Sequence, residues 1–104
     1  MPATASMLHH HVTLTPRPDQ VDATRELLHE CATQVLRKKD ENGPSSWWSS
    51  YSEVRGVFFV EALFADEDAV QFHQGNIQPI VERFGALMAA PPDTVVRAVF
   101  VSTP

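Results

Sequence analysis

Residues 57–64 are apolar on both faces of the strand that they are expected to form, and this pattern constrains the fold more than any other sequence feature. Their alternate residues make two sets, and both are hydrophobic except at Glu61. Residues 94–102 repeat the pattern with valine, alanine and phenylalanine. Successive side chains of a strand point to opposite faces, and an antiparallel sheet with one face in water alternates apolar and polar residues. Both faces of this sheet are therefore expected to be covered.

Hydrophobic periodicity predicts the remaining elements. Strands are expected over residues 7–15, 45–52, 57–64 and 94–102, and the middle pair forms a hairpin. Apolar residues at helical spacing predict a first helix over residues 19–39. Acidic residues 66–68 begin a second helical region, which Gly75 and Asn76 are expected to divide into two helices.

The resulting β-α-β-β-α-β order is typical of the ferredoxin-like α+β fold, an antiparallel four-stranded sheet with helices on one face. One domain spans residues 1–104, because 104 residues are too few for two domains. Helices on one face leave the other face open. We therefore expect a homodimer in which two such faces pack together into a dimeric α/β barrel.

Composition excludes several classes of partner. The 13 acidic and 8 basic residues give a formal net charge of −5, which argues against nucleic acid. The single cysteine, Cys31, lies in a helical pattern and favours a reducing, cytoplasmic setting. Residues 1–6 lack the features of a secretory signal, and no apolar run reaches the ~20 residues of a membrane span. Secretion and membrane insertion are not expected.

Motifs for common cofactors are missing from the sequence. Its 4 glycines form no dinucleotide-binding or phosphate-binding loop, and no G-x-S-x-G pattern is present. His9 and His11 share one strand face and offer two metal ligands, but no acid or cysteine at a recognisable spacing supplies a third. We therefore expect neither a nucleotide cofactor nor a metal.

The sequence FVEALFADEDAVQFH at residues 59–73 resembles the strand-then-helix signature of the antibiotic biosynthesis monooxygenases, a family of dimeric α/β barrels. The shared features are acidic and aromatic strand residues, an Asp-Glu-x-Ala start to the helix, and His73. The resemblance continues through residues 76–87. Glu61 departs from it, since the family's strand glutamate would fall at Ala62, on the other face of the strand.

The resemblance implies oxygenation of an electron-rich phenolic or polyketide-type aromatic molecule by dioxygen, without flavin, haem or metal. Such a substrate, once deprotonated, can itself pass an electron to dioxygen. The protein then needs a general base, hydrogen-bond donors and a dry apolar pocket. Related barrels imply alternatives, which are a polyketide cyclase or another tailoring enzyme, a haem-binding protein that uses His73, and a non-catalytic binding protein.

The catalytic candidates are His73, His10 and Tyr51. His73 matches the helix histidine of the family, and an unperturbed imidazole titrates near neutral pH. His10 shares its strand face with apolar Leu8 and Val12, so it lies either in the pocket or in the subunit interface. The Tyr51 hydroxyl can donate a hydrogen bond to the substrate.

Six further residues are expected to contact the substrate: Trp47, Trp48, Phe64, Phe72, Asn42 and Arg55. The aromatic residues can stack on a flat ring, and Asn42 and Arg55 can donate hydrogen bonds to an oxyanion. Trp47 and Tyr51 share one face of their strand, whereas Trp48 takes the other. The alternative explanation is packing for the aromatic residues and a place in a turn for Asn42 and Arg55.

Overall fold

The computed structural model describes residues 7–103 of the chain. In chain order its elements are β1 (Leu8–Leu14), the short 3-10 turn η1 (Pro18–Gln20), α1 (Val21–Arg37), β2 (Ser46–Ser52), β3 (Val57–Phe64), α2 (Glu67–Val81), the 3-10 turn η2 (Gly85–Leu87) and β4 (Asp93–Ala98). The expectation that residues 1–6 carry no signal lies outside the described residues. No helix within the described part of the chain is both long enough and apolar enough to span a membrane.

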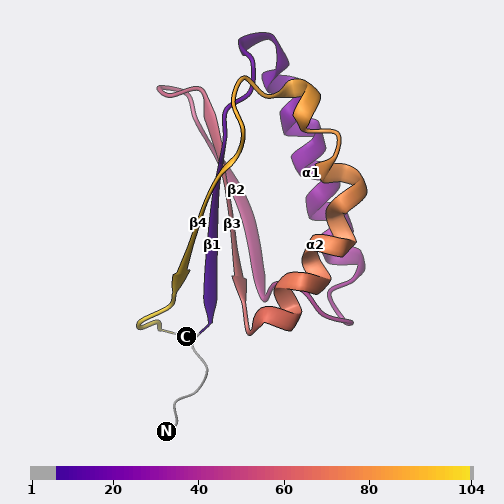
Figure 1. Cartoon of the computed structure of the whole chain (residues 1–104), viewed down its shortest axis with the longest axis vertical. Helices are drawn as coiled ribbons and strands as arrows, with labels where there is room; N and C mark the ends of the chain where they lie inside the picture. The colour runs from indigo at the N-terminus through magenta and orange to yellow at the C-terminus, as the bar shows by residue number, and fades with distance from the viewer. Residues whose placement is uncertain (1–6, 104) are drawn as a thin grey trace, which may run out of the picture.

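The sheet confirms the ferredoxin-like prediction. Within residues 7–103 it has four strands in the order β2-β3-β1-β4, and every neighbouring pair is antiparallel. Both helices lie on the same side of the sheet (Figure 1). The side chains that the helices cover come from the helix-side faces of β1, β2 and β3.

The hairpin between β2 and β3 forms where the sequence predicts it. Gly56 adopts a φ of +67°, a left-handed conformation that residues with a Cβ rarely adopt. Its N–H donates a hydrogen bond of 2.7 Å to the Ser52 carbonyl and closes the turn. This turn sets the register in which Trp47 faces Ala62 and Tyr51 faces Phe58.

The core lies between the sheet and the helices, in two clusters of buried side chains. The larger cluster joins α1 to the sheet and to the segment after α2 through Leu14, Leu27, Leu28, Cys31, Phe58, Phe84 and Met88. The smaller cluster packs the start of α2 on β3 through Ala62, Phe64, Ala69 and Val70. Burial of this apolar surface is the main favourable term in folding, at roughly 25 cal/mol per Å².

The expected division of the second helix at Gly75 and Asn76 is wrong, because α2 runs through both residues. Its start is fixed by Asp66, whose Oδ1 accepts a hydrogen bond of 2.9 Å from the Ala69 N–H. Asn76 exchanges hydrogen bonds with Gln34 of α1, one of them 2.7 Å long. This contact between helices stabilises a stretch where local propensity disfavours a helix.

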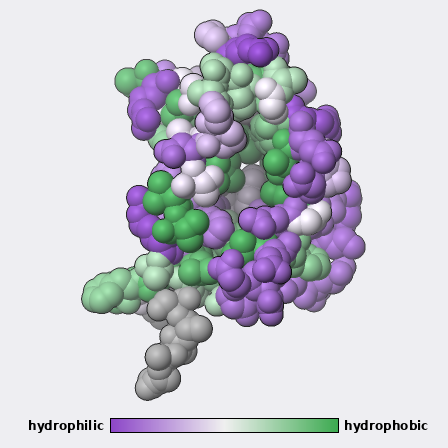
Figure 2. Space-filling view, viewed as in Figure 1, coloured by the Kyte–Doolittle hydropathy of each residue, from purple (hydrophilic) through white to green (hydrophobic). Residues whose placement is uncertain are grey.

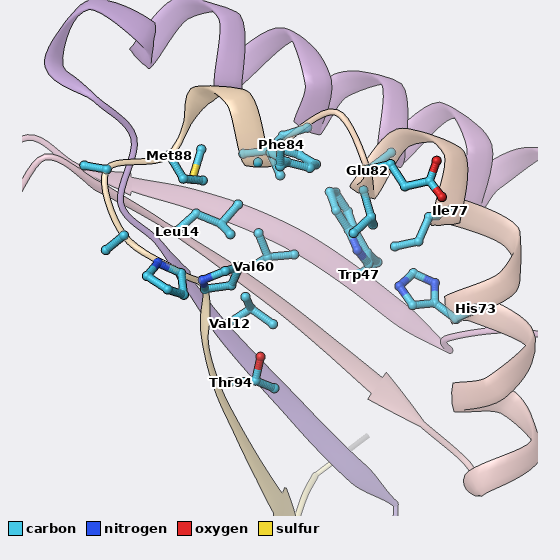
Figure 3. A pocket seen from close by; sticks show the side chains of 18 residues that line it. Val12, Leu14, Trp47, Val60, His73, Ile77, Glu82, Phe84, Met88 and Thr94 are labelled. Carbon is cyan, nitrogen blue, oxygen red and sulfur yellow. The ribbon is translucent and has the colours of Figure 1, made fainter.

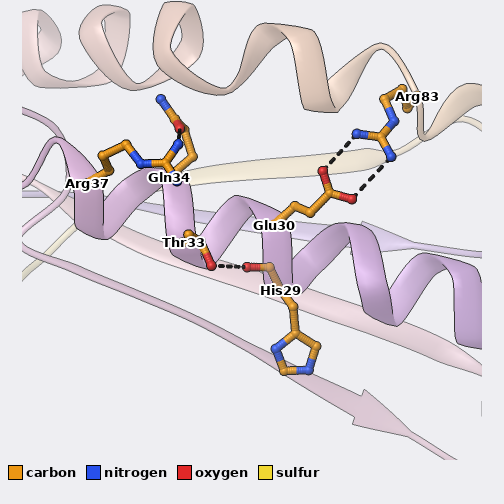
Figure 4. Close-up of polar contacts among 6 residues, drawn as sticks. All are labelled: His29, Glu30, Thr33, Gln34, Arg37 and Arg83. Carbon is orange, nitrogen blue, oxygen red and sulfur yellow. Dashed lines mark hydrogen bonds and ion pairs between the residues drawn. The ribbon is translucent and has the colours of Figure 1, made fainter.

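The expected third helix is reduced to a short turn. The chain leaves α2 through tight turns in which the Phe84 N–H donates to the Val81 carbonyl, and only the 3-10 turn η2 follows. An ion pair holds this segment against α1: both terminal nitrogens of Arg83 contact the Glu30 carboxylate, at 2.8 and 3.1 Å (Figure 4). Phe84 and Met88, predicted to lie on a helix, instead reach the core from irregular chain.

The last strand is shorter than predicted and ends at Ala98 rather than at residue 102. β4 is an edge strand whose neighbour, β1, begins at Leu8, and Leu8 pairs with Ala98. Beyond this pair the Val99 N–H still donates to the Met7 carbonyl, at 2.8 Å. Among residues 7–103, no strand lies beside the residues that follow to complete a ladder, and Phe100 is 98% exposed.

Candidate functional site

A cavity of about 720 Å³ lies between the helix-side face of the sheet and α2 with the segment that follows it. This size is within the range of small-molecule sites, which is about 300–1,000 Å³. Figure 2 shows the hollow with hydrophobic side chains around it and polar ones farther out. Its wall includes Val12, Leu14, Leu28, Cys31, Trp47, Val60, His73, Ile77, Phe84, Met88 and Thr94. The lining is mostly apolar, with few polar groups.

Side chains of α2 approach the sheet across this cavity (Figure 3). His73 and Ile77 are four residues apart on α2, so they lie on one face of the helix. Trp47 of β2 and Val60 of β3 lie on the facing wall. The cap at Asp66 and the packing of Val70 on β3 fix the helix, and thereby the position of His73.

His73 is the polar side chain with the most unusual environment in the cavity wall. It is 9% exposed, and its Nδ1 atom is buried without a hydrogen-bond partner in the described chain. Loss of hydration, and to a smaller extent the charge of the nearby His10, lowers the pKa of His73 to about 4. His73 is therefore a neutral imidazole at physiological pH, with a buried ring nitrogen that no described group contacts by a hydrogen bond.

His10 lies on the helix side of the sheet and not on its open face. Its ring packs edge-on against Phe64, with centroids 4.9 Å apart, and Phe64 in turn contacts His73 at 5.3 Å. Burial lowers the pKa of His10, and the opposing effect of Glu67 is smaller. Phe64 is 1% exposed and separates the two imidazoles. Neither His10 nor Phe64 is among the residues that line the cavity.

The aromatic residues of β2 are divided between three environments. Trp47 lines the cavity. Tyr51, on the same strand face, packs on Phe58 at 4.6 Å and borders a separate, smaller hollow that Trp47 also lines. Trp48 points to the opposite, open face of the sheet, where it is 41% exposed. The structure thus brings Trp47 together with His73 but leaves Tyr51 and Trp48 apart from them.

The other predicted substrate contacts also lie outside the cavity wall. Asn42 is exposed in the loop before β2, where its Oδ1 accepts a hydrogen bond from the Gly43 N–H. Phe72 points toward this loop, with its ring about 3.8 Å from where a Cβ on Gly43 would stand. Arg55 lies over the ring of Phe59, at 5.5 Å. Their roles at a substrate stay predictions that this arrangement does not favour.

Several cavity residues were not expected from the sequence to contact a ligand. Phe84 and Met88 belong to an apolar stripe that predicts helix packing, Ile77 lies in the same predicted helical region, and Val12 belongs to the apolar face of β1. Helical or strand spacing identifies such residues as buried but does not separate core from cavity wall. Whether such a residue lies in the core or in a cavity wall depends on how closely the facing elements approach each other.

The expectation that no third ligand group accompanies His9 and His11 is wrong, because Glu61 lies beside both on the open face of the sheet. Glu61 stands directly opposite His11 in the register of β1 and β3. Its Oε1 atom lies 3.1 Å from His9 Nε2 and 3.3 Å from His11 Nδ1. A carboxylate 50 residues away in sequence reaches both imidazoles because the two strands pair, which no local spacing reveals.

No protein-family model matches the sequence, and no curated protein matches it either. Solved structures do. A Caulobacter crescentus protein, named provisionally as an antibiotic biosynthesis monooxygenase, is 23% identical, with a TM-score of 0.82 over 94% of this chain and 93% of that chain. A Nitrosomonas europaea protein with the same provisional name is 16% identical, with a TM-score of 0.83 over 100% of both chains. The chain has the antibiotic biosynthesis monooxygenase fold.

A third solved structure is also similar to this chain. It is a Mycobacterium tuberculosis protein, 21% identical, with a TM-score of 0.80 over 95% of this chain and 100% of that chain. The chain therefore corresponds to essentially the whole length of each of these proteins. The fold that the resemblance of residues 59–73 implied is confirmed.

Because His73 is buried, the free energy of unfolding of this chain is expected to fall in acid. The pKa of His73 is 6.5 in the unfolded chain and about 4 in the folded one, so the unfolded state binds the proton first. The stabilisation is complete above pH 6.5 and is lost as the pH falls to about 4, with a total on the order of 3 kcal/mol. Urea denaturation at pH 7 and pH 4 measures it. His73→Gln should lose less stability over this interval than the wild type, and an equal loss in both proteins would contradict the assignment.

Proposed function

We propose that the chain is a cofactor-independent monooxygenase that oxidises a phenolic or polyketide-type aromatic molecule with dioxygen. The observation that carries the proposal is His73, a neutral imidazole with an unpartnered Nδ1 in the wall of an apolar cavity. A buried polar atom without a partner is costly, and a small turn of the ring toward the cavity would let a ligand hydroxyl supply the partner. The fold shared with provisionally named monooxygenases is consistent with this activity.

The lining of the cavity suits a fused aromatic ring that carries few polar groups. Trp47 offers an indole face for stacking and an N–H that can only donate, while Val12, Val60 and Ile77 supply apolar contacts. Such a lining excludes water from the ring and strengthens hydrogen bonds made inside the cavity. The substrate hydroxyl is then directed to His73.

The chemistry begins with transfer of the phenolic proton to His73. A neutral imidazole is free to accept it, and the phenolate formed beside the ring raises the pKa of the resulting imidazolium by opposite charge. The phenolate passes one electron to dioxygen, and the radical pair combines to form a C–O bond. The peroxide anion formed in this way takes the proton back from His73. Loss of water from the resulting hydroperoxide removes the hydrogen of the oxygenated carbon and breaks the O–O bond, so one oxygen atom stays in the quinone and the other leaves as water. All four electrons that reduce dioxygen come from the substrate.

A second copy of this chain is the proposed partner of the open sheet face. Trp48 and Val95 lie on this face and are 41% and 36% exposed, and the partly buried Phe59 packs edge-on against His11 on the same face. Two such faces related by a two-fold axis would cover each other.

The buried, free thiol of Cys31 is in keeping with a reducing compartment such as the cytoplasm.

Oxygen consumption tests the proposed activity directly. The purified chain is mixed with a panel of phenols of increasing ring number, in the presence of a metal chelator and without flavin, and dissolved oxygen and product mass are followed. We expect uptake of one dioxygen per quinone formed with at least one fused-ring phenol. A cyclised product without oxygen uptake would instead assign a cyclase. Tight binding without any product would assign a binding protein.

A further inference from the structure

The open face of the sheet carries a second cluster of reactive side chains, apart from the His73 cavity. His9 and His11 of β1 and Glu61 of β3 project from this face, whereas His10 and Ala62 project toward the helices. Both helices lie on the other side (Figure 1). An inference about this cluster is therefore independent of the proposed oxygenase function.

The distances within this cluster are those of a metal ligand set. Glu61 Oε1 lies 3.1 Å from His9 Nε2 and 3.3 Å from His11 Nδ1, and all three atoms lie within 4.8 Å of one another. Two ligand atoms of a tetrahedral zinc site with bonds of about 2.0–2.1 Å are separated by about 3.3 Å. The two contacts of Glu61 already match this separation. The third separation is the one between the ring nitrogens of His9 and His11. Rotation of the two partly exposed imidazoles about their side-chain torsions can shorten it to the same value.

Aromatic neighbours flank the two imidazoles. The ring of His9 lies nearly parallel to that of Trp48, with centroids 6.3 Å apart, and the ring of His11 packs edge-on against Phe59 at 5.4 Å. Paired strands form the scaffold, and sites on strands are held more precisely than sites on loops. The aromatic groups also limit access of water, which strengthens binding of a cation by the carboxylate.

We propose that His9, His11 and Glu61 form a binding site for a divalent transition metal, with Zn²⁺ as the ion that fits best. Two imidazole nitrogens and one carboxylate oxygen are ligands that Zn²⁺ accepts, and three protein ligands leave a fourth position open. Mg²⁺ and Ca²⁺ prefer oxygen ligands and would find one carboxylate. The open position faces away from the helices, toward solvent or toward a second copy of the chain.

The same contacts could arise if Glu61 only accepts hydrogen bonds from the two imidazoles, and metal titration distinguishes the two cases. The full chain, stripped with chelator, is titrated with ZnCl₂ by calorimetry and in competition with a chelating dye. We expect one Zn²⁺ per chain. Glu61→Gln and His11→Gln should each weaken binding by at least the roughly 10- to 100-fold that loss of a supporting group costs.

The matched control is His10→Gln, which removes a histidine between the two ligands on the same strand but on the opposite face. It should bind Zn²⁺ with the wild-type affinity. Circular dichroism confirms the folding of each variant, and visible absorption of bound Co²⁺ reports a tetrahedral site in the wild type. The proposal is overturned if the wild type binds no stoichiometric Zn²⁺, or if Glu61→Gln binds it as tightly as the wild type. Equal weakening by His10→Gln would overturn it as well.

Discussion

Replacing His73 by glutamine is expected to lower the rate of phenol oxidation by at least about 100-fold, the lower limit for a general base. Glutamine keeps a polar side chain in the cavity wall but cannot accept a proton. The loss should appear in kcat and in kcat/KM together, because proton transfer is an interaction of the transition state. Oxygen consumption with the phenol that the wild type oxidises measures the effect.

Two comparisons make this result specific. His29→Gln replaces an exposed histidine of α1 and should keep the wild-type rate. Trp47→Leu removes stacking area from the cavity wall and should raise KM more than it lowers kcat, since stacking stabilises ground and transition states alike. Full activity of His73→Gln would remove the catalytic assignment but leave the fold unaffected.

Replacing Val95 by aspartate is expected to convert a dimer into a monomer. Val95 pairs with His11 in the sheet and lies on the open face, where a two-fold partner would bury it. The symmetry of a homodimer places the substitution in the interface twice, and each unpaired buried carboxylate costs several kcal/mol, so the dissociation constant should rise at least about 100-fold. Analytical ultracentrifugation at micromolar concentration distinguishes the 11.6 kDa chain from its dimer.

The control for this substitution is Val54→Asp. Val54 is 99% exposed in the turn between β2 and β3, so the same chemical change there should leave the dimer intact. A wild-type chain that sediments as a well-folded monomer would reject the proposed assembly. A monomeric Val54→Asp variant would show instead that added charge, and not the open face, controls association.

The strands and the hairpin were predictable from sequence because their signals are local. Alternation of side chains identified the face of β1 that carries His10, and Gly56 marked the turn that pairs β2 with β3. The same argument failed at Gly75 and Asn76, where hydrogen bonds between Asn76 and Gln34 of α1 outweigh a weak local preference. It also failed at the end of β4, because a strand stops where its neighbour stops.

The candidate site was only partly predictable. The sequence placed His73 on a helix and Trp47 on a strand, and the structure brings both to one cavity. Tyr51 and Trp48 are close to Trp47 in sequence, yet packing directs one toward Phe58 and the other toward the open face. Sequence proximity along a strand does not decide which side chains share a wall.

The sequence by itself determined the order of the elements, the two faces of each strand and the class of the fold, because periodicity and turn residues act over a few neighbouring positions. Tertiary structure alone decided which residues meet across strands. Glu61 reaches His9 and His11 through the register of β1 and β3, and His73 loses its hydration, and with it an ordinary pKa, through packing against the sheet. Both effects arise from contacts between residues far apart in the chain, and such contacts leave no local pattern.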